Sequence, residues 1–223
     1  MLRRARSSYA TAQIEAMAKP DTQITQLLEL EDSIVDTYYF ELMNGELRRS
    51  NPFAGAQLRF GGLRALEAKV QNAYLYPGTP EAIARAEIEL ADWNLLFNSF
   101  GYAMVSYEKA LAKFRSRGGD ESQVAALFSP ATPVPLPAFI PNTSVFGEEH
   151  NVRGTIDVEI EVNRYGGVRD VSVVDASGNA SDAVQKRLRR FVYRSRFRPR
   201  FVDGDWQRSD RFVQRYEFGY TQS

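Results

Sequence analysis

The stretch "GTIDVEIEVNRYGGVRDVSVVD" (residues 154–175) alternates apolar and polar side chains with a period of two. This alternation predicts β-strands that are buried on one face only. Gly166 and Gly167 interrupt the pattern and offer two positions for a positive φ, so we expect a hairpin turn there. The residues expected to face the core are Ile156, Val158, Ile160 and Val162 on the first strand, and Val168, Val171 and Val173 on the return strand.

The residues that follow predict a helix and then a closing strand. Ser181 is a typical N-cap residue, and Asp182 suits the first turn of a helix. Val184, Leu188 and Phe191 would form one apolar face of it. Pro199 would end the helix, and "VDGDWQ" (202–207) would be a loop before the last strand. In that strand, one parity faces the helix (Phe212, Tyr216, Phe218 and Tyr220) and the other faces outward (Arg211, Val213, Arg215 and Glu217).

The residues from 21 to 128 predict helices instead. Residues 21–44, "DTQITQLLELEDSIVDTYYFELMN", carry apolar residues at spacings of three and four, with Asp21 as N-cap. A second helix should end at "YPGTP" (76–80). A helical hairpin should then start at Thr79-Pro80 and break between 99 and 101. We expect "SQVAALF" (122–128) to cap this helical domain.

The helical hairpin resembles the tetratricopeptide repeat. The residues at the spacings of that repeat are Leu90, Ala91, Ala103, Tyr107 and Ala110. The repeat's early Trp and closing Pro are absent, so an unrelated helical bundle is the alternative. A lone repeat cannot bury its apolar face, and neighbouring helices would have to complete the stack. We expect Trp93 to be a core residue; as a functional alternative, Trp93, Asn94 and Asn98 would line a peptide-binding groove.

Five of the ten prolines fall within "SPATPVPLPAFIPN" (129–142). Proline disfavours both helix and sheet, so we predict an extended linker over 129–150 or a strap laid across a domain. The chain would therefore have an α+β fold in four parts. These are a flexible N-terminal segment (1–20), a helical domain (21–128), the proline-rich linker (129–150) and a small sheet domain (151–223).

Residues 154–220 resemble the C-terminal domain of the TonB energy-transducer family. The matching features are Gly154 at the start of the alternating strand, the glycine turn, the helix end "RSRFRP" (194–199) and the closing strand "FVQRYEF" (212–218). The resemblance implies that the last strand pairs with an extended segment of an outer-membrane receptor. The edge residues that would bind this partner are Arg211, Val213, Gln214, Arg215, Tyr216 and Glu217.

The sequence departs from that family before residue 154. An energy transducer has a transmembrane helix and a long proline-rich spacer, whereas here no apolar run approaches the ~20 residues that cross a bilayer. A helical domain takes the place of the spacer, and "EEHNV" (148–152) stands where a Tyr-Pro motif is usual. The first residues lack the apolar region of a signal peptide. The resemblance implies a periplasmic location with the targeting segment absent from this sequence; a cytoplasmic location is the alternative.

Charge and motifs exclude several classes of function. Lys plus Arg equals Asp plus Glu, at 28 each, so no global field favours a polyanion. There is no cysteine, and the single histidine, in "GEEH" (147–150), cannot complete a metal site alone. No enzyme or nucleotide-binding motif occurs. We therefore expect no enzyme activity, metal or cofactor.

A basic cluster, "KRLRRFVYRSRFRPR" (186–200), holds seven arginines. Because its apolar residues form a stripe, we predict a solvated helix face and expect no nucleic-acid binding. The basic face would contact acidic strand residues such as Asp157, Glu159 and Glu161, or an anionic envelope surface.

Taken together, these patterns predict a periplasmic protein–protein interaction module that couples to an outer-membrane receptor or transporter by strand addition. The alternative is a structural or adaptor subunit of another bacterial envelope complex, for secretion or motility, with no transport role. The partner would be a receptor segment or another envelope protein. A larger complex and a homo-oligomer are both compatible with the sequence.

Overall fold

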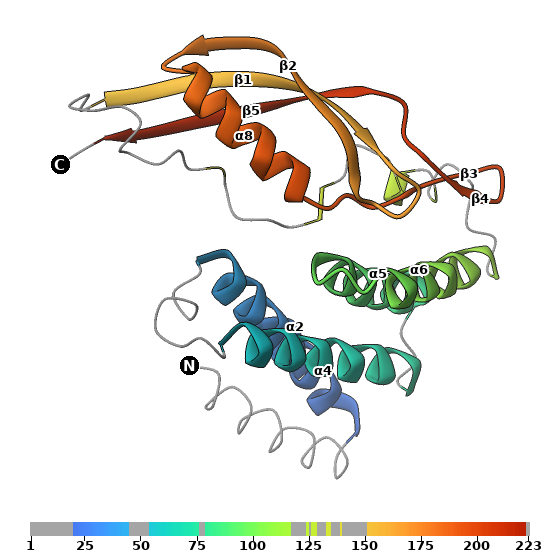
Figure 1. Cartoon of the computed structure of the whole chain (residues 1–223). Helices are drawn as coiled ribbons and strands as arrows, with labels where there is room; N and C mark the ends of the chain where they lie inside the picture. Colours follow the sequence, from blue (N-terminus) through green and yellow to red (C-terminus); the bar gives the residue numbers. More distant parts are fainter. Residues whose placement is uncertain are drawn as a thin grey trace. The chain divides into compact units, whose positions relative to one another are not determined.

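The computed structural model describes residues 20–44, 54–75, 79–116, 124, 126–128, 133–134, 139 and 151–221. The chain divides into two compact units, Met1–Gly119 and Asp120–Ser223. The first unit contains helices, and the second contains an antiparallel sheet with one long helix (Figure 1). The predicted α+β fold class is therefore confirmed.

The helical unit contains four described helices, each of which packs against the next one along the chain. Their bounds are Pro20–Asn44 for α2, Ala54–Leu75 for α4, Pro80–Leu96 for α5 and Phe100–Arg115 for α6. The Thr79 side chain accepts a hydrogen bond from the Ala82 backbone N–H, so the predicted start of α5 is correct. Asp21 is not an N-cap, because it lies inside α2.

An aromatic cluster around Trp93 joins three helices of this unit. Trp93 of α5 is 1% exposed and donates from Nε1 to the Arg59 carbonyl oxygen of α4 at 3.0 Å. Its ring contacts Tyr38 and Tyr39 of α2 edge-on. Gly62 of α4 lies against the same ring, because a Cβ built at Gly62 would come within 2.1 Å of Trp93 Cζ2. The expectation that Trp93 is a core residue is confirmed.

Helices α5 and α6 approach closely through small residues. Ala91 on α5, and Ala103 and Ala110 on α6, are all fully buried. Tyr107 is also fully buried, and its hydroxyl donates to Asp92 Oδ1 at 2.6 Å. The buried phenol thus has a carboxyl oxygen as acceptor, which avoids the cost of an unpaired polar group.

The second unit is built on a three-stranded antiparallel sheet of order β2-β1-β5. The bounds are Asn151–Val162 for β1, Val168–Gly178 for β2, Asp182–Arg194 for α8 and Phe212–Thr221 for β5. Helix α8 covers one face of the sheet (Figure 1). The even-numbered residues of β1 from Ile156 to Val162 are buried against it, as predicted. Ser181 is the N-cap of α8, but its hydroxyl makes no capping hydrogen bond.

The turn between β1 and β2 needs one positive φ, not the two that we predicted. Gly166 has a φ of 81°, whereas the φ of Gly167 is not positive. The Asn163 side chain closes the turn, because its Oδ1 accepts hydrogen bonds from the backbone N–H groups of Tyr165 and Gly167. An asparagine side chain thus provides the constraint that we assigned to a second glycine.

The segment predicted as a loop at 202–207 is instead a second β-hairpin. It consists of β3 (Arg200–Val202) and β4 (Asp205–Gln207). The two residues between the strands, Asp203 and Gly204, both have positive φ, at 53° and 88°. This is the pattern of a type I′ turn, for which Asp-Gly is a preferred sequence. The prediction of a loop was therefore wrong, because Asp203-Gly204 is a hairpin turn between two short strands.

The described part of the proline-rich segment packs against the second unit. Pro133 forms a β-bridge with Phe197, and the Val134 N–H donates to the Arg196 carbonyl oxygen at 2.9 Å. Phe139 packs on Phe191 and Phe218. These residues form a strap, which was the second of the two predicted possibilities.

Residues 122–128 also differ from the expectation, because they fall in the second unit and not in the helical one. Phe128 is 1% exposed, and its ring contacts Trp206 of β4 at 5.3 Å. The Phe128 side chain is therefore buried against the β3–β4 hairpin.

The close contact between Gly62 and Trp93 predicts a large effect of one methyl group. Gly62→Ala should lower the free energy of unfolding by about 1–3 kcal/mol, because the added Cβ would overpack a rigid ring. Gly101→Ala in α6 is a matched control, because no atom lies within 4 Å of its Cβ position. Urea denaturation of both variants measures the difference; equal stabilities would contradict this packing.

Candidate protein-interaction site

Strand β5 lies at one edge of the sheet, with β1 as its single neighbour among the described strands. The β1–β5 pairing runs without interruption from Asn151 opposite Thr221 to Ile160 opposite Phe212. At the other edge, the β1–β2 pairing is interrupted twice, at 157/158 and 161/162. Such bulges bend a strand and protect it from pairing with another chain. The regular edge available for an added strand is therefore that of β5.

Backbone hydrogen bonds at the two ends of β1 determine which backbone groups of β5 point to this edge. The Arg153 carbonyl oxygen accepts from Asn179, on the β2 side, at 2.9 Å. The Val162 carbonyl oxygen accepts from Ser209, on the β5 side, also at 2.9 Å. Backbone groups alternate in direction along a strand, so the even-numbered residues of β1 bond to β5. In the observed register, they pair with even-numbered residues of β5.

The odd-numbered residues of β5 consequently direct their N–H and C=O groups away from β1. These residues are Val213, Arg215, Glu217 and Gly219. Four donors and four acceptors would thus face a strand added at this edge. Gln214 and Tyr216, in contrast, use their backbone groups within the sheet.

Five of the six candidate edge residues were assigned a face from the sequence, and their side chains follow the predicted parity. Arg211, Val213, Arg215 and Glu217 are exposed, and Val213 is 58% exposed. Tyr216 lies on the inner face, where its ring contacts Phe191 of α8. Burial raises the pKa of the Tyr216 phenol to about 12. The Gln214 amide oxygen is buried there too, with no hydrogen-bond donor in the described part of the chain.

The outward arginines of this region are paired with carboxylates of the same sheet. Arg215 donates from Nε and Nη2 to the two carboxylate oxygens of Asp157, at 2.8 and 2.7 Å. Arg211 donates to Glu159 at 2.8 Å and to Asp170 at 2.9 Å. We expected the arginines of the 186–200 cluster to contact these acidic strand residues. That expectation was wrong for α8, because the helix covers the opposite face of the sheet.

The second predicted site, a groove in the helical unit, is not assembled. The Trp93 ring is buried in the core, so it cannot line a surface groove. The Asn94 amide donates to the Leu90 carbonyl oxygen of its own helix at 3.0 Å. Asn98 is exposed in the turn after α5, with φ 60°. The structure therefore assigns these three residues to a core, a helix and a turn.

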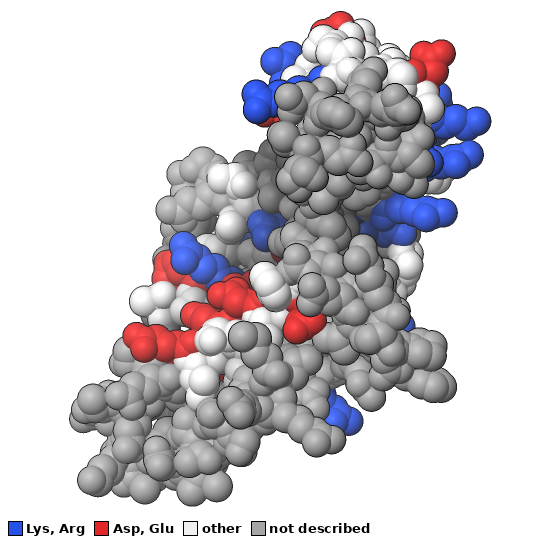
Figure 2. Space-filling view, turned by 90° about the vertical axis from the view of Figure 1, so that its left-hand side faces the viewer, with Lys and Arg blue, Asp and Glu red and all other residues white. Residues whose placement is uncertain are grey.

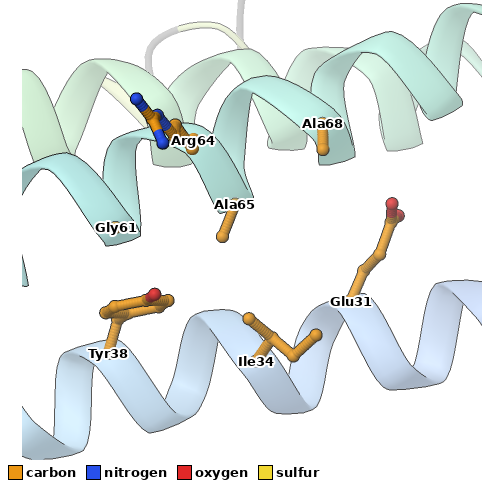
Figure 3. Close-up of a pocket in the computed structure, with 7 residues that line it drawn as sticks. All are labelled: Glu31, Ile34, Tyr38, Gly61, Arg64, Ala65 and Ala68. Atoms are coloured by element: carbon orange, nitrogen blue, oxygen red, sulfur yellow. The ribbon is translucent and has the colours of Figure 1, made fainter. Parts of the chain in front are cut away.

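A small cavity of about 240 Å³ lies between α2 and α4 (Figure 3). Ile34 and Tyr38 of α2 face Gly61 and Ala65 of α4 across it, and Glu31 reaches between the helices. The Glu31 carboxylate accepts a hydrogen bond from the Asn72 amide of α4. The volume is below the ~300–1,000 Å³ that is typical of small-molecule sites. The cavity is therefore a weaker candidate site than the β5 edge.

The described ranges contain neither a membrane-spanning helix nor a metal cluster. No described helix is both long and apolar enough to cross a membrane. Within the same residues, no group of three His, Cys, Asp or Glu side chains could hold a metal ion. The "GEEH" segment (147–150) lies outside the described residues. Comparisons with protein-family models, with curated proteins and with solved structures found no significant match to this chain.

The orientation of the β5 backbone predicts an alternating pattern of hydrogen exchange. The amides of Val213, Arg215 and Glu217 should exchange faster than those of Gln214 and Tyr216, because only the latter bond to β1. Native-state exchange followed by NMR measures each amide separately. Equal protection of both sets would mean that the edge is already covered.

The pairing of Arg215 with Asp157 predicts a change in a carboxylate titration. The hydrogen bonds from Arg215 lower the pKa of Asp157, so the pair stabilises the fold at neutral pH. This contribution is lost as the pH falls through the Asp157 pKa. Arg215→Gln should raise that pKa towards its ordinary value, as measured by ¹³C NMR of the carboxyl carbon. Arg169→Gln is the control, because Arg169 pairs with Glu161; an unchanged Asp157 pKa in Arg215→Gln would contradict the pairing.

Proposed function

We propose that this chain is a periplasmic protein–protein interaction module of the TonB type, which couples to an outer-membrane receptor or transporter by β-strand addition. The observation that carries the proposal is the regular ten-residue edge strand β5 (Phe212–Thr221). Its odd-numbered backbone groups are directed away from the sheet. Main-chain hydrogen bonds of this kind give affinity to an added strand, and nearby side chains give selectivity.

Several local features are compatible with the family resemblance. The chain order is strand, strand, helix, strand, with the additional β3–β4 hairpin before β5. Gly154, which opens the alternating strand, lies under the Phe218 ring, and a Cβ there would come within 2.5 Å of Phe218 Cζ. Gly166 supplies the positive φ of the turn. Each of these residues belongs to the motifs on which the resemblance rests.

The helical unit would act as an attached scaffold with a tetratricopeptide-like hairpin. The buried small residues of α5 and α6, such as Ala91 and Ala103, are those that the repeat uses for close helix packing. Trp93 is buried and lines no open groove among the described residues, so we assign the partner-binding role to β5. The alternative, an adaptor subunit of another envelope complex, requires a partner other than a receptor segment.

Proline variants at two neighbouring positions of β5 distinguish strand addition from a purely structural role of this strand. Val213→Pro removes an N–H that faces the free edge, so the second unit should stay folded. Gln214→Pro removes an N–H that bonds to β1 and should destabilise the unit. The probes are synthetic peptides from the N-terminal periplasmic segments of outer-membrane receptors that the same genome encodes. Val213→Pro should weaken their binding by about 1 kcal/mol or more for the lost bond.

Calorimetry and circular dichroism on the full chain measure binding and folding for each variant. Arg215→Ala is the side-chain control and should reduce binding much less than Val213→Pro. If a folded Val213→Pro variant binds the peptides as tightly as the native chain, strand addition at β5 is wrong. If no receptor peptide binds the native chain, the adaptor function is favoured.

A further inference from the structure

Helix α8 carries a set of basic side chains that differs from three arginines on the outer face of the sheet. The members of the set are Lys186, Arg187, Arg189, Arg190 and Arg194. On the outer face of the sheet, Arg169, Arg211 and Arg215 all form ion pairs with carboxylates. The α8 set forms none with the described residues. In Figure 1, α8 lies in front of the sheet. Figure 2 views the molecule from the left of Figure 1, and several Lys and Arg side chains (blue) project there on the right.

Three members of this set line a hollow in the surface. Arg187, Arg190 and Arg194 border a space of about 370 Å³ together with Phe191 and Ser195. The spacing of three and then four residues places the three arginines on one face of α8, along about 10 Å of helix. Like charges at these spacings destabilise a helix. Repulsion among these three charges therefore does not stabilise the helix, and an anionic ligand would relieve it.

We propose that the arginine hollow on α8 binds an acidic, extended segment of a protein partner. Guanidinium groups bind carboxylates through paired hydrogen bonds. Acidic residues two positions apart on an extended chain are about 6.6 Å apart, close to the ~6 Å rise between Arg190 and Arg194. This site goes beyond the proposed function, because it requires no strand addition at β5.

The side chains of α8 favour a peptide over a membrane or a nucleic acid. Val184, Leu188 and Val192 are fully buried against the sheet, so the helix offers no apolar face for insertion into a bilayer. Single-stranded nucleic acids bind aromatic platforms. On α8, Tyr193 is the one large aromatic that is exposed, and the Phe191 ring packs on Phe139 and Tyr216.

The test uses the full chain and a fluorescein-labelled peptide of alternating glutamate and serine, followed by fluorescence anisotropy at low salt. The native protein should bind this peptide but not its glutamine-for-glutamate counterpart. The triple variant Arg187→Gln, Arg190→Gln and Arg194→Gln should weaken binding about tenfold or more, with an unchanged thermal unfolding transition. A matched control removes three exposed charges elsewhere: Arg164→Gln, Arg169→Gln and Arg208→Gln. It should change binding less than about twofold.

Other outcomes would overturn the proposal. Equal losses in the two triple variants would mean that binding depends on net charge and not on the hollow. The absence of peptide binding would also contradict it. Tighter binding to phosphatidylglycerol vesicles or to an oligothymidine strand, lost in the α8 variant, would assign the hollow to a membrane or a nucleic acid instead.

Discussion

The second unit depends on the way in which β1 divides its backbone hydrogen bonds between two neighbours. The Arg153 and Val162 carbonyl oxygens accept from opposite sides of the strand. The odd-numbered residues of β1 bond to β2, and the even-numbered residues bond to β5. Each outer strand therefore has one set of backbone N–H and C=O groups that forms no hydrogen bond within the sheet. The bulges of β2 protect its edge, whereas β5 has none. The candidate site is thus a consequence of the sheet order.

The period of two was sufficient to predict much of this unit. It identified which residues of β1 and β5 face α8, because side-chain burial alternates with sequence parity. The five candidate edge residues that were assigned a face therefore have the exposures expected of them. The parity of side chains does not reveal which strand lies next to β5. That information comes from a pairing between residues about 60 positions apart, such as Asp157 and Arg215.

The wrong predictions have local and non-local causes. The Asp203-Gly204 turn carried a clear hairpin signal, but the residues on either side are only three-residue strands, too short to show a period. The strap required knowledge of distant partners, since Phe139 packs on Phe191 and Phe218. Trp93 was predicted correctly as a core residue, but a groove remained the alternative. Its neighbour Gly62 lies on another helix, and a helical pattern alone cannot separate a core tryptophan from one that lines a groove.

The arginines on the two faces of the sheet unit differ in whether a carboxylate of the same unit balances their charge. This difference separates a structural role of the arginines from a role in binding. On the outer face, Arg215 lies directly opposite Asp157 in the register, so its charge is balanced within the protein. A strand added beside β5 would therefore meet a neutralised surface and would be held mainly by main-chain bonds. On α8, the charges are balanced by no described carboxylate. We therefore expect a preference of this unit for acidic partners to come from the helix rather than from Arg211 and Arg215 at the strand edge.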